Sequence, residues 1–184
     1  MRFFLALEIP PEDKQSLKSI QNRLQNILPD IRLTDPDKLH LTLVFVGDQK
    51  PELKEALIEV MNHAVEGIGP FEVTPAYIDG FPTIHHPETI WVGVKGDVDK
   101  LHILRERIKD GLISLNLPVD ERRFVPHIAI AKAQQPEVTL AQEERLEVLV
   151  GEVPPIVVTS IKLLQSIPDD GLHTHNTLAE IKLL

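Results

Sequence analysis

Two short apolar runs of this chain each begin with a histidine. His40 opens the run His-Leu-Thr-Leu, and His127 opens the run His-Ile-Ala-Ile. Side chains two positions apart share one face of a β-strand, so Thr42 shares the face of His40 while the two leucines face a core. Two imidazoles that meet across a cleft can serve as a general acid and a general base. That pairing suits phosphoryl or acyl transfer without a metal ion.

A structural role is the alternative for each histidine taken alone. A single histidine in a strand is more often a surface residue or a hydrogen-bonded core residue than a catalyst. The surroundings of the two histidines match, however, because residues 37–47 and residues 123–132 are both strand-forming sequence. The duplication therefore favours a shared site made of two similar halves.

The composition is that of an ordinary globular protein. The chain has 184 residues, 42% of them hydrophobic and 26% charged, which predicts a single domain over residues 1–184. Cysteine is absent, which excludes disulfides, thiolate zinc sites and cysteine nucleophiles. No apolar stretch approaches membrane-spanning length, and the run at residues 3–7 is too short for a signal peptide. We therefore expect a cytoplasmic protein that does not bind membranes.

The charge balance limits the partners. Acidic residues outnumber basic ones, 28 to 19, which gives a formal net charge of −9. Such a field repels long nucleic-acid backbones, so we expect no binding to extended duplexes. A small phosphorylated substrate or the end of an RNA strand remains compatible with local cations. Four basic residues flank the histidine runs, among acidic neighbours that also allow a simple solvated surface: Lys38, Arg122, Arg123 and Lys132.

Hydrophobic periodicity predicts the elements that carry these residues. The first half is expected to contain a strand at 2–8, a helix after Pro10, the first histidine strand and a helix at 53–64. Paired strands at 71–78 and 89–94 follow, joined by a turn-rich segment at 80–83, and then a helix at 101–115 and the second histidine strand. The chain ends with a helical stretch at 140–150 and strands at 156–165 and 174–183 around a turn at 168–171. Strand, helix, histidine strand and helix thus occur twice. This order predicts two similar α+β lobes with both histidines at their junction.

The histidine runs belong to longer motifs. Residues 39–47 match the pattern L-H-[LI]-T-L-x-F-[LV]-G, and residues 123–132 match R-F-x-P-H-[LIV]-T-[LI]-A-R at all but two positions. In these motifs the sequence resembles the 2H phosphoesterase superfamily, and specifically its RNA 2′,3′-cyclic phosphodiesterase branch, also called 2′-5′ RNA ligases. The run at residues 91–94 and the segment 166–171 are further family-like pieces, and the resemblance covers essentially the whole chain.

The resemblance implies a fold and an activity. The fold is α+β and bilobal, a pseudo-twofold duplication in which two antiparallel sheets flanked by helices enclose a central cleft. The activity is metal-independent hydrolysis of RNA 2′,3′-cyclic phosphate ends to 2′-phosphate, with His127 as general base and His40 as general acid, although the sequence leaves the reverse assignment open. Running the reaction backwards would join a 5′-hydroxyl to the cyclic end. We expect RNA ends or short oligonucleotides as partners, no cofactor, no metal and a monomer.

The same resemblance suggests substrate-binding residues. Thr42 would donate a hydrogen bond to a non-bridging phosphate oxygen. Phe45 matches a position associated with stacking on a base. Strict alternation turns Phe45 away from His40, so a core role is an equal alternative unless the strand bulges.

Three positions depart from the family pattern. Ala129 stands where the family has threonine, so only its backbone can contact a phosphate. Lys132 stands where arginine is usual, which keeps the charge but loses the bidentate fork, and it lies at an odd offset from His127. His175 falls near a position often held by tyrosine, and we expect an exposed strand residue there in preference to a cleft residue.

Two other functions compete with the first. The missing hydroxyl at Ala129 motivates a catalytically weakened protein that binds RNA ends or nucleotides. A phosphodiesterase for small cyclic nucleotides would use the same chemistry. The pairs at residues 85–86 and 173–175 invite a metal site, but no third ligand is evident in the sequence, so we expect none.

Overall fold

A computed structural model describes residues 1–169 and 172–184 of the chain. Its main helices are α1 (Lys14–Ile27), α2 (Lys54–Ala64), α3 (Val98–Ser114) and α4 (Leu140–Glu147). Its strands are β1 (Arg2–Glu8), β2 (Arg32–Leu33), β3 (His40–Asp48), β4 (Phe71–Phe81), β5 (Thr89–Gly96), β6 (His127–Lys132), β7 (Ile156–Val158), β8 (Ser160–Asp169) and β9 (Leu172–Lys182). The predicted helices and both histidine strands are confirmed. Two residues of the expected turn at 168–171 lie outside the described part.

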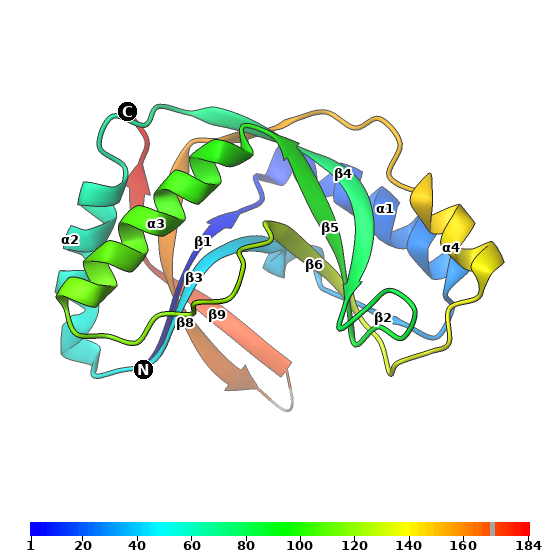
Figure 1. The fold of residues 1–184 in the computed structure, drawn as a ribbon, viewed down its shortest axis with the longest axis horizontal. Helices are drawn as coiled ribbons and strands as arrows, with labels where there is room; N and C mark the ends of the chain where they lie inside the picture. The colour runs from blue at the N-terminus through cyan, green and yellow to red at the C-terminus, as the bar shows by residue number, and fades with distance from the viewer. Residues whose placement is uncertain (170–171) are drawn as a thin grey trace.

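The described strands form one antiparallel sheet of nine strands in the order β7-β4-β5-β6-β3-β1-β8-β9, with β2 paired to β6. The two central strands, β3 and β6, are joined at a single registered pair, Leu41 with Ile128. Along this order four strands lie on each side of the junction, with β2 added beside β6, and the sheet curls strongly at the junction (Figure 1). We call β3, β1, β8 and β9 the His40 lobe, and β6, β5, β4 and β7 the His127 lobe. The bilobal α+β fold is thus confirmed. The two expected antiparallel sheets, however, are two halves of one sheet, because β3 and β6 pair with each other.

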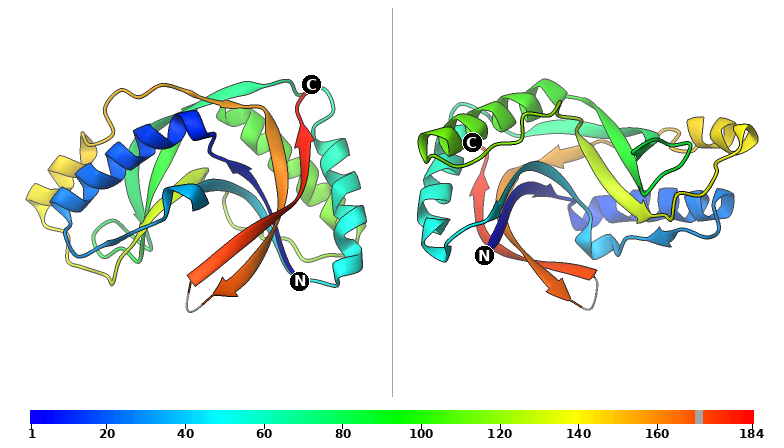
Figure 2. Two further views of the ribbon diagram at one scale, coloured as in Figure 1. Left: turned by 180° about the vertical axis from the view of Figure 1, so that it is seen from behind. Right: turned by 60° about the horizontal axis from the view of Figure 1, so that its bottom comes forward.

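The helices are exchanged between the lobes. Helix α1 connects β1 to β3 in the sequence, yet it contacts β6 and α4. Helix α3 connects β5 to β6, yet it contacts β3 and α2. Figures 1 and 2 show α2 and α3 together beside the His40 lobe, and α1 and α4 together beside the His127 lobe. Each lobe is therefore covered by a helix that lies, in the sequence, between two strands of the other lobe. These strands are β1 and β3 for α1, with the short β2 between α1 and β3, and β5 and β6 for α3.

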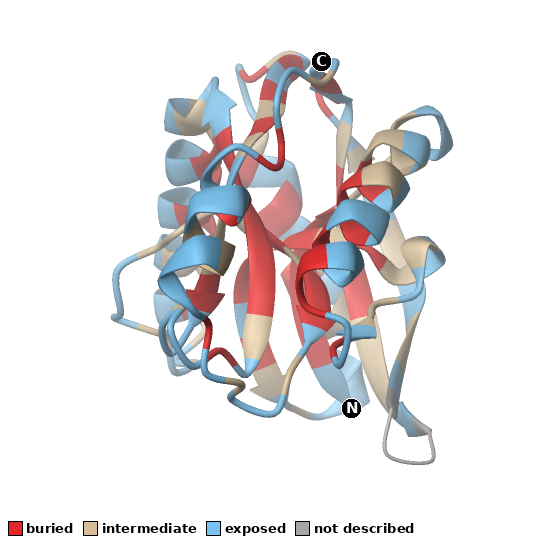
Figure 3. Cartoon of the chain, turned by 90° about the vertical axis from the view of Figure 1, so that its right-hand side faces the viewer, coloured by how far each residue is buried: buried red, intermediate tan, exposed pale blue. Residues whose placement is uncertain are grey.

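The core lies between the sheet and these helices. Helix α1 buries residues at helical spacing, namely Leu17, Ile20, Gln21, Leu24 and Ile27, as expected for an amphipathic helix. In Figure 3 the buried segments of strands and helices face one another, while the outer faces of the helices are exposed. Most of the buried apolar residues form one large cluster that draws on both lobes, and Phe4, Ala6 and Leu164 form a second, small one. No helix among residues 1–169 and 172–184 combines the length and apolarity that crossing a bilayer would need.

Two predicted strands differ from the structure. Strand β4 continues to Phe81, so the first residues of the predicted turn at 80–83 extend the hairpin with β5. The run predicted as one strand at 156–165 is two strands, because β7 pairs with β4 in one lobe while β8 pairs with β1 in the other. The chain crosses between the lobes at Thr159, which a single continuous strand could not do.

Candidate active site

Both histidines lie on one face of the sheet, beside the junction of the lobes. Leu41 and Ile128 pair directly and are buried on the opposite face. In an antiparallel pair the positions on either side of such a contact also face each other. The register therefore sets His40 opposite Ala129, and Thr42 opposite His127. We call this side of the sheet the histidine face.

The two imidazoles are anchored in the same way. His40 Nδ1 lies 2.9 Å from the carbonyl oxygen of Lys38, and His127 Nδ1 lies 2.7 Å from that of Val125. A carbonyl oxygen only accepts hydrogen bonds, so each Nδ1 carries a proton and donates it. Each Nε2 is thereby left as the ring nitrogen that can accept a proton.

Burial disfavours the protonated form of both imidazoles. The pKa of His40 lies below its usual 6.5, chiefly because burial removes solvent from the charged form; the Lys38 carbonyl raises it, His175 and His127 lower it, and Glu8 raises it. Burial likewise lowers the pKa of His127, against the opposing effect of the Val125 carbonyl. An anionic phosphate between the rings would raise both pKa values. Burial and a bound anion therefore act on the two pKa values in opposite directions.

Strand β3 bulges, and the bulge decides where Phe45 lies. Leu5 of β1 pairs with Val44 while Ala6 pairs with Thr42, which leaves Leu43 as an extra residue. Leu43 and Val44 are both buried, and the next side chain, Phe45, is 61% exposed. Phe4 contacts both His40 and Phe45, at ring-centroid distances of 5.3 and 6.1 Å. The orientation given by strict alternation is therefore wrong, and Phe45 lies on the histidine face.

Strand β6 bulges at the equivalent position. Ile90 of β5 pairs with Ala131 while Trp91 pairs with Ala129, so Ile130 is the extra residue. The bulge returns Lys132 to the side of His127, where its Nζ donates to Thr89 Oγ1 at 3.0 Å. Strict alternation would turn Lys132, at an odd offset from His127, to the opposite face of the sheet, and the bulge reverses this. Thr42 and Ala129 hold matching half-buried positions, each two residues after its histidine.

The two bulges are held by the two buried polar side chains of the described chain. Gln21 of α1 donates from Nε2 to the Ile130 carbonyl at 2.9 Å. Arg105 of α3 donates from Nη1 to the Leu43 carbonyl at 2.6 Å. A bulge displaces backbone groups from the strand ladder, and a buried carbonyl needs a donor. Because α1 and α3 are exchanged between lobes, each helix supports the histidine strand of the other half.

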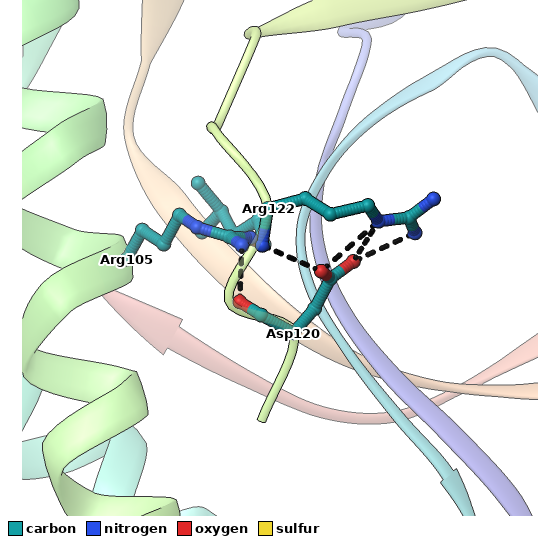
Figure 4. A network of polar contacts seen from close by, with 4 residues as sticks. Arg105, Asp120 and Arg122 are labelled. Carbon is teal, nitrogen blue, oxygen red and sulfur yellow. Dashed lines mark hydrogen bonds and ion pairs between the residues drawn. The ribbon is translucent and has the colours of Figure 1, made fainter. Parts of the chain in front are cut away.

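Arg105 also fixes the loop that leads into β6. Its Nη2 donates to the Asp120 carbonyl at 3.2 Å, and its guanidinium lies 4.7 Å from the Phe124 ring centroid. Figure 4 shows this network together with Arg122, which binds the Asp120 carboxylate. Hydrogen bonds from Arg122 lower the pKa of Asp120 to about 2. Arg122, one of the cations predicted for the site, is thus held by Asp120.

The aromatic surroundings of the two histidines differ. His40 lies against Phe4 and against His175, whose ring centroid is 5.3 Å away in an edge-on arrangement. The expectation that His175 is simply an exposed strand residue is wrong, because β9 reaches across β8 and brings this side chain onto the histidine face. His127 lies against Phe81 at 5.1 Å and Trp91 at 5.3 Å.

Sequence reasoning missed several of these neighbours. Phe81 was placed in a turn, although the β4–β5 hairpin presents it beside His127. Glu8, at the end of β1, affects the charge at His40 and accepts from Lys162 Nζ at 2.8 Å. Burial raises its pKa, but the ion pair with Lys162 outweighs this and leaves the carboxyl below its usual range. Its position two residues before a Pro-Pro step gave no signal of this role.

Two buried side-chain nitrogen atoms in the described part of the chain have no hydrogen-bond partner, and both flank the histidine pair. They are Nε2 of His175, beside His40, and Nε1 of Trp91, beside His127. A buried donor without an acceptor costs about 1–3 kcal/mol. Such groups gather where a ligand supplies the missing partner.

Comparisons with known proteins agree with these features. The sequence profile of the 2′-5′ RNA ligase superfamily matches residues 10–166. An RNA 2′,3′-cyclic phosphodiesterase of Geobacillus stearothermophilus is 31% identical over 161 residues, covering 85% of this chain and 51% of that protein, so the chain spans about half of its length. One from Methanothermobacter thermautotrophicus is 23% identical, over 89% of this chain and 85% of that protein.

Solved structures share the fold. A crystal structure of a Thermus thermophilus protein superposes with a TM-score of 0.80 at 21% identity, covering 100% of this chain and 98% of that one. E. coli LigT complexed with 3′-AMP superposes with a TM-score of 0.70 at 22% identity, over 99% and 97% of the two chains. The profile match covers most of the sequence, and the resemblance read from the histidine motifs is confirmed. This chain belongs to the 2′-5′ RNA ligase superfamily.

Proposed function

We propose that this chain hydrolyses 2′,3′-cyclic phosphate ends of RNA or short oligonucleotides and leaves a 2′-phosphate. One observation carries the proposal. Two imidazoles on adjacent strands share a face, each with its Nδ1 committed to a carbonyl and its Nε2 uncommitted. The activity named for the relatives in Geobacillus and Methanothermobacter supports the same reaction.

Ring opening needs two proton transfers in line with phosphorus. His127 Nε2 takes a proton from water as the water oxygen bonds to phosphorus. His40 Nε2 gives a proton to O3′ as the P–O3′ bond breaks. The product carries a 2′-phosphate and a 3′-hydroxyl. Family analogy assigns these two roles, and binding of the phosphodiester anion favours the protonated form of His40 that the acid role needs.

The remaining predicted residues bind the substrate. The Thr42 hydroxyl, opposite His127, would donate to a non-bridging oxygen, where charge accumulates. Phe45, exposed on the histidine face, would stack on the terminal base. Lys132 would attract the phosphate as a point charge. At Ala129 only the backbone is available, so the second half of the site lacks one hydroxyl donor.

Ala129 favours a second candidate function. Loss of one donor to a phosphate oxyanion costs about 10²–10³ in rate when nothing replaces it. A protein with such a loss could bind RNA ends or nucleotides with little turnover. A phosphodiesterase for small cyclic nucleotides is a further candidate with the same chemistry.

One experiment separates these candidates. A short RNA ending in 2′,3′-cyclic phosphate and a mononucleoside 2′,3′-cyclic phosphate are each incubated with the protein in chelator, and products are read by phosphorus NMR beside His40→Ala and His127→Ala. We expect a 2′-phosphate from the RNA with the wild type alone. Binding of the RNA without turnover would favour the binding protein. Turnover of the mononucleotide alone would favour the small-molecule enzyme.

A further inference from the structure

A groove with a volume of about 510 Å³ lies beside His127. Its wall includes Tyr77, Asp79 and Phe81 of β4, Trp91 of β5 and Arg123 before β6. Phe81 and Trp91 are also the rings packed against the His127 imidazole. Phe81 and Trp91 therefore lie between the groove and the proposed catalytic residue, and no step of the hydrolysis above uses the groove.

The groove displays aromatic rings that a folded protein usually buries. Tyr77 is 43% and Phe81 38% exposed, and both stand on the histidine face because β4 bulges at Ala76. The Tyr77 ring lies flat over Gly93, where a Cβ atom would come within 2.1 Å of the ring. Exposed, fixed rings on a strand are stacking platforms for nucleobases. Phe45, in the His40 lobe, is the other aromatic side chain exposed to this degree among the described residues.

Polar groups of complementary character lie between these rings. Asp79 pairs across the strands with Trp91 and stands between Tyr77 and Phe81 on the same face. One carboxylate oxygen accepts from the Gly80 amide at 2.8 Å, and Asp79 forms no ion pair within the described residues. The Trp91 side chain is only 3% exposed, and its N–H has no acceptor. An acceptor and a donor thus stand side by side.

Guanine fits this pair of groups. Its N1–H and amino N–H groups are adjacent donors that one carboxylate can bind together, and its O6 is an acceptor beside them. The other bases offer a carboxylate only one donor position on the same edge. Phe81 packs on Trp91 at 4.9 Å, so a base that enters beside Tyr77 must displace that ring to reach the indole N–H.

The in-line arrangement of entering and leaving oxygens at phosphorus indicates which nucleoside carries the guanine in the groove. The leaving O3′ is next to His40, so the nucleoside with the cyclic phosphate lies on the Phe45 side. The entering nucleophile must then approach from the His127 side, where the groove lies. We propose that this groove binds the 5′-terminal guanosine of an acceptor strand, whose 5′-hydroxyl can replace water. This inference rests on the proposed function.

The resulting step balances. The 5′-oxygen bonds to phosphorus as its proton passes to His127, and the P–O3′ bond breaks as His40 protonates O3′. The product is a 2′,5′-phosphodiester with a free 3′-hydroxyl. Positioning a nucleoside in the groove raises the effective concentration of its hydroxyl against water. Arg123, in the wall of the groove, would meet the first phosphate of the acceptor.

The test measures the ratio of ligated to hydrolysed product. An RNA with a 2′,3′-cyclic phosphate end is supplied with dinucleotide acceptors that carry a 5′-hydroxyl, GpA, ApA, CpA or UpA. We expect the ratio for GpA to exceed the others by at least about tenfold, the usual effect of a hydrogen bond to a charged group. Asp79→Asn should bring GpA to the level of the others, and Tyr77→Ala should lower the ratio for all four. Glu72→Gln, an exposed carboxyl on the same strand, is the matched control.

A second readout does not depend on turnover. Trp91 is the single tryptophan of the chain and lines the groove, so GpA alone should change its fluorescence at lower concentration than ApA does. Hydrolysis with equal ratios for the four acceptors and no selective fluorescence change would overturn this inference and leave the proposed function standing. Selective fluorescence change by GpA without hydrolysis would overturn the proposed function and retain the guanine site.

Discussion

The His40 and His127 halves of the site share their backbone but not their side chains. In each half the histidine Nδ1 donates to the carbonyl two residues earlier, and a bulge three residues later returns the fifth side chain to the histidine face. The side chains that this backbone presents differ, Thr42 and Phe45 in one half, Ala129 and Lys132 in the other. The two halves thus share the supports of their imidazoles, while the side chains presented beside those imidazoles differ.

The largest expected effect comes from removing either imidazole. His40→Ala and His127→Ala should each lower kcat by about 10²–10⁴, the usual contribution of a positioned general acid or base. The core residues of β3 and β6 face the opposite side of the sheet from the two histidines, so the folded structure should persist in both variants. Rates on an RNA with a 2′,3′-cyclic phosphate end and circular dichroism spectra check this. Near wild-type turnover in either variant would contradict the two-histidine mechanism.

Making the halves more alike should raise the rate. Ala129→Thr restores to the His127 half the hydroxyl that Thr42 supplies to the His40 half, and kcat should rise by up to about 10². Ala129→Ser is the smaller control, because it adds a hydroxyl without the methyl group that must fit beside Trp91. Single-turnover rates of hydrolysis by the wild type and the two variants measure this effect. Unchanged rates in both variants would mean that the wild-type site already supplies that donor.

Removing the side chains of Gln21 and Arg105, which donate to the carbonyls of the two bulges, should destabilise the two halves separately. Gln21→Leu removes the side-chain donor to the Thr34 carbonyl and leaves the Ile130 carbonyl with the Thr34 amide alone. Arg105→Met removes the side-chain donor to the Leu43 and Asp120 carbonyls. Each change should lower the free energy of unfolding by about 1–3 kcal/mol, measured by urea denaturation. The double variant should be close to additive if the supports are independent. A loss below about 0.5 kcal/mol in either variant would show that its bulge does not need that donor.

The smallest effect concerns pH. Burial lowers the pKa of both imidazoles below 6.5, so the free protein should show a bell-shaped kcat/KM profile with its maximum below pH 6.5. Bound substrate raises both pKa values, so the maximum of kcat should lie at higher pH. The unfolded chain binds more protons than the folded one as pH falls through 6.5, so stability should decrease over that range. Coinciding kcat and kcat/KM profiles would contradict this account.

The sequence predicted the elements that local patterns encode. Helices α1, α2 and α3 follow from apolar residues at helical spacing, and both histidine strands follow from β-prone runs. The side of the sheet taken by Phe45 and Lys132 did not follow, because alternation fails at a bulge. A bulge depends on the register of the neighbouring strand and on donors far away in the chain. Gln21 lies 109 positions from Ile130, and Arg105 lies 62 positions from Leu43.

His175 and Phe81 show the same limit. Each lies in a segment whose own sequence indicates an ordinary exposed strand or turn. What places them beside the histidines is the order of strands in the sheet, which brings β9 to His40 across β8 and β1, and β4 to His127 across β5. The sequence by itself determined which groups can transfer protons, since residue type fixes an imidazole and its ordinary pKa. Only the tertiary structure decided which groups surround those imidazoles and how far burial lowers their pKa, since both depend on contacts between residues distant in the chain.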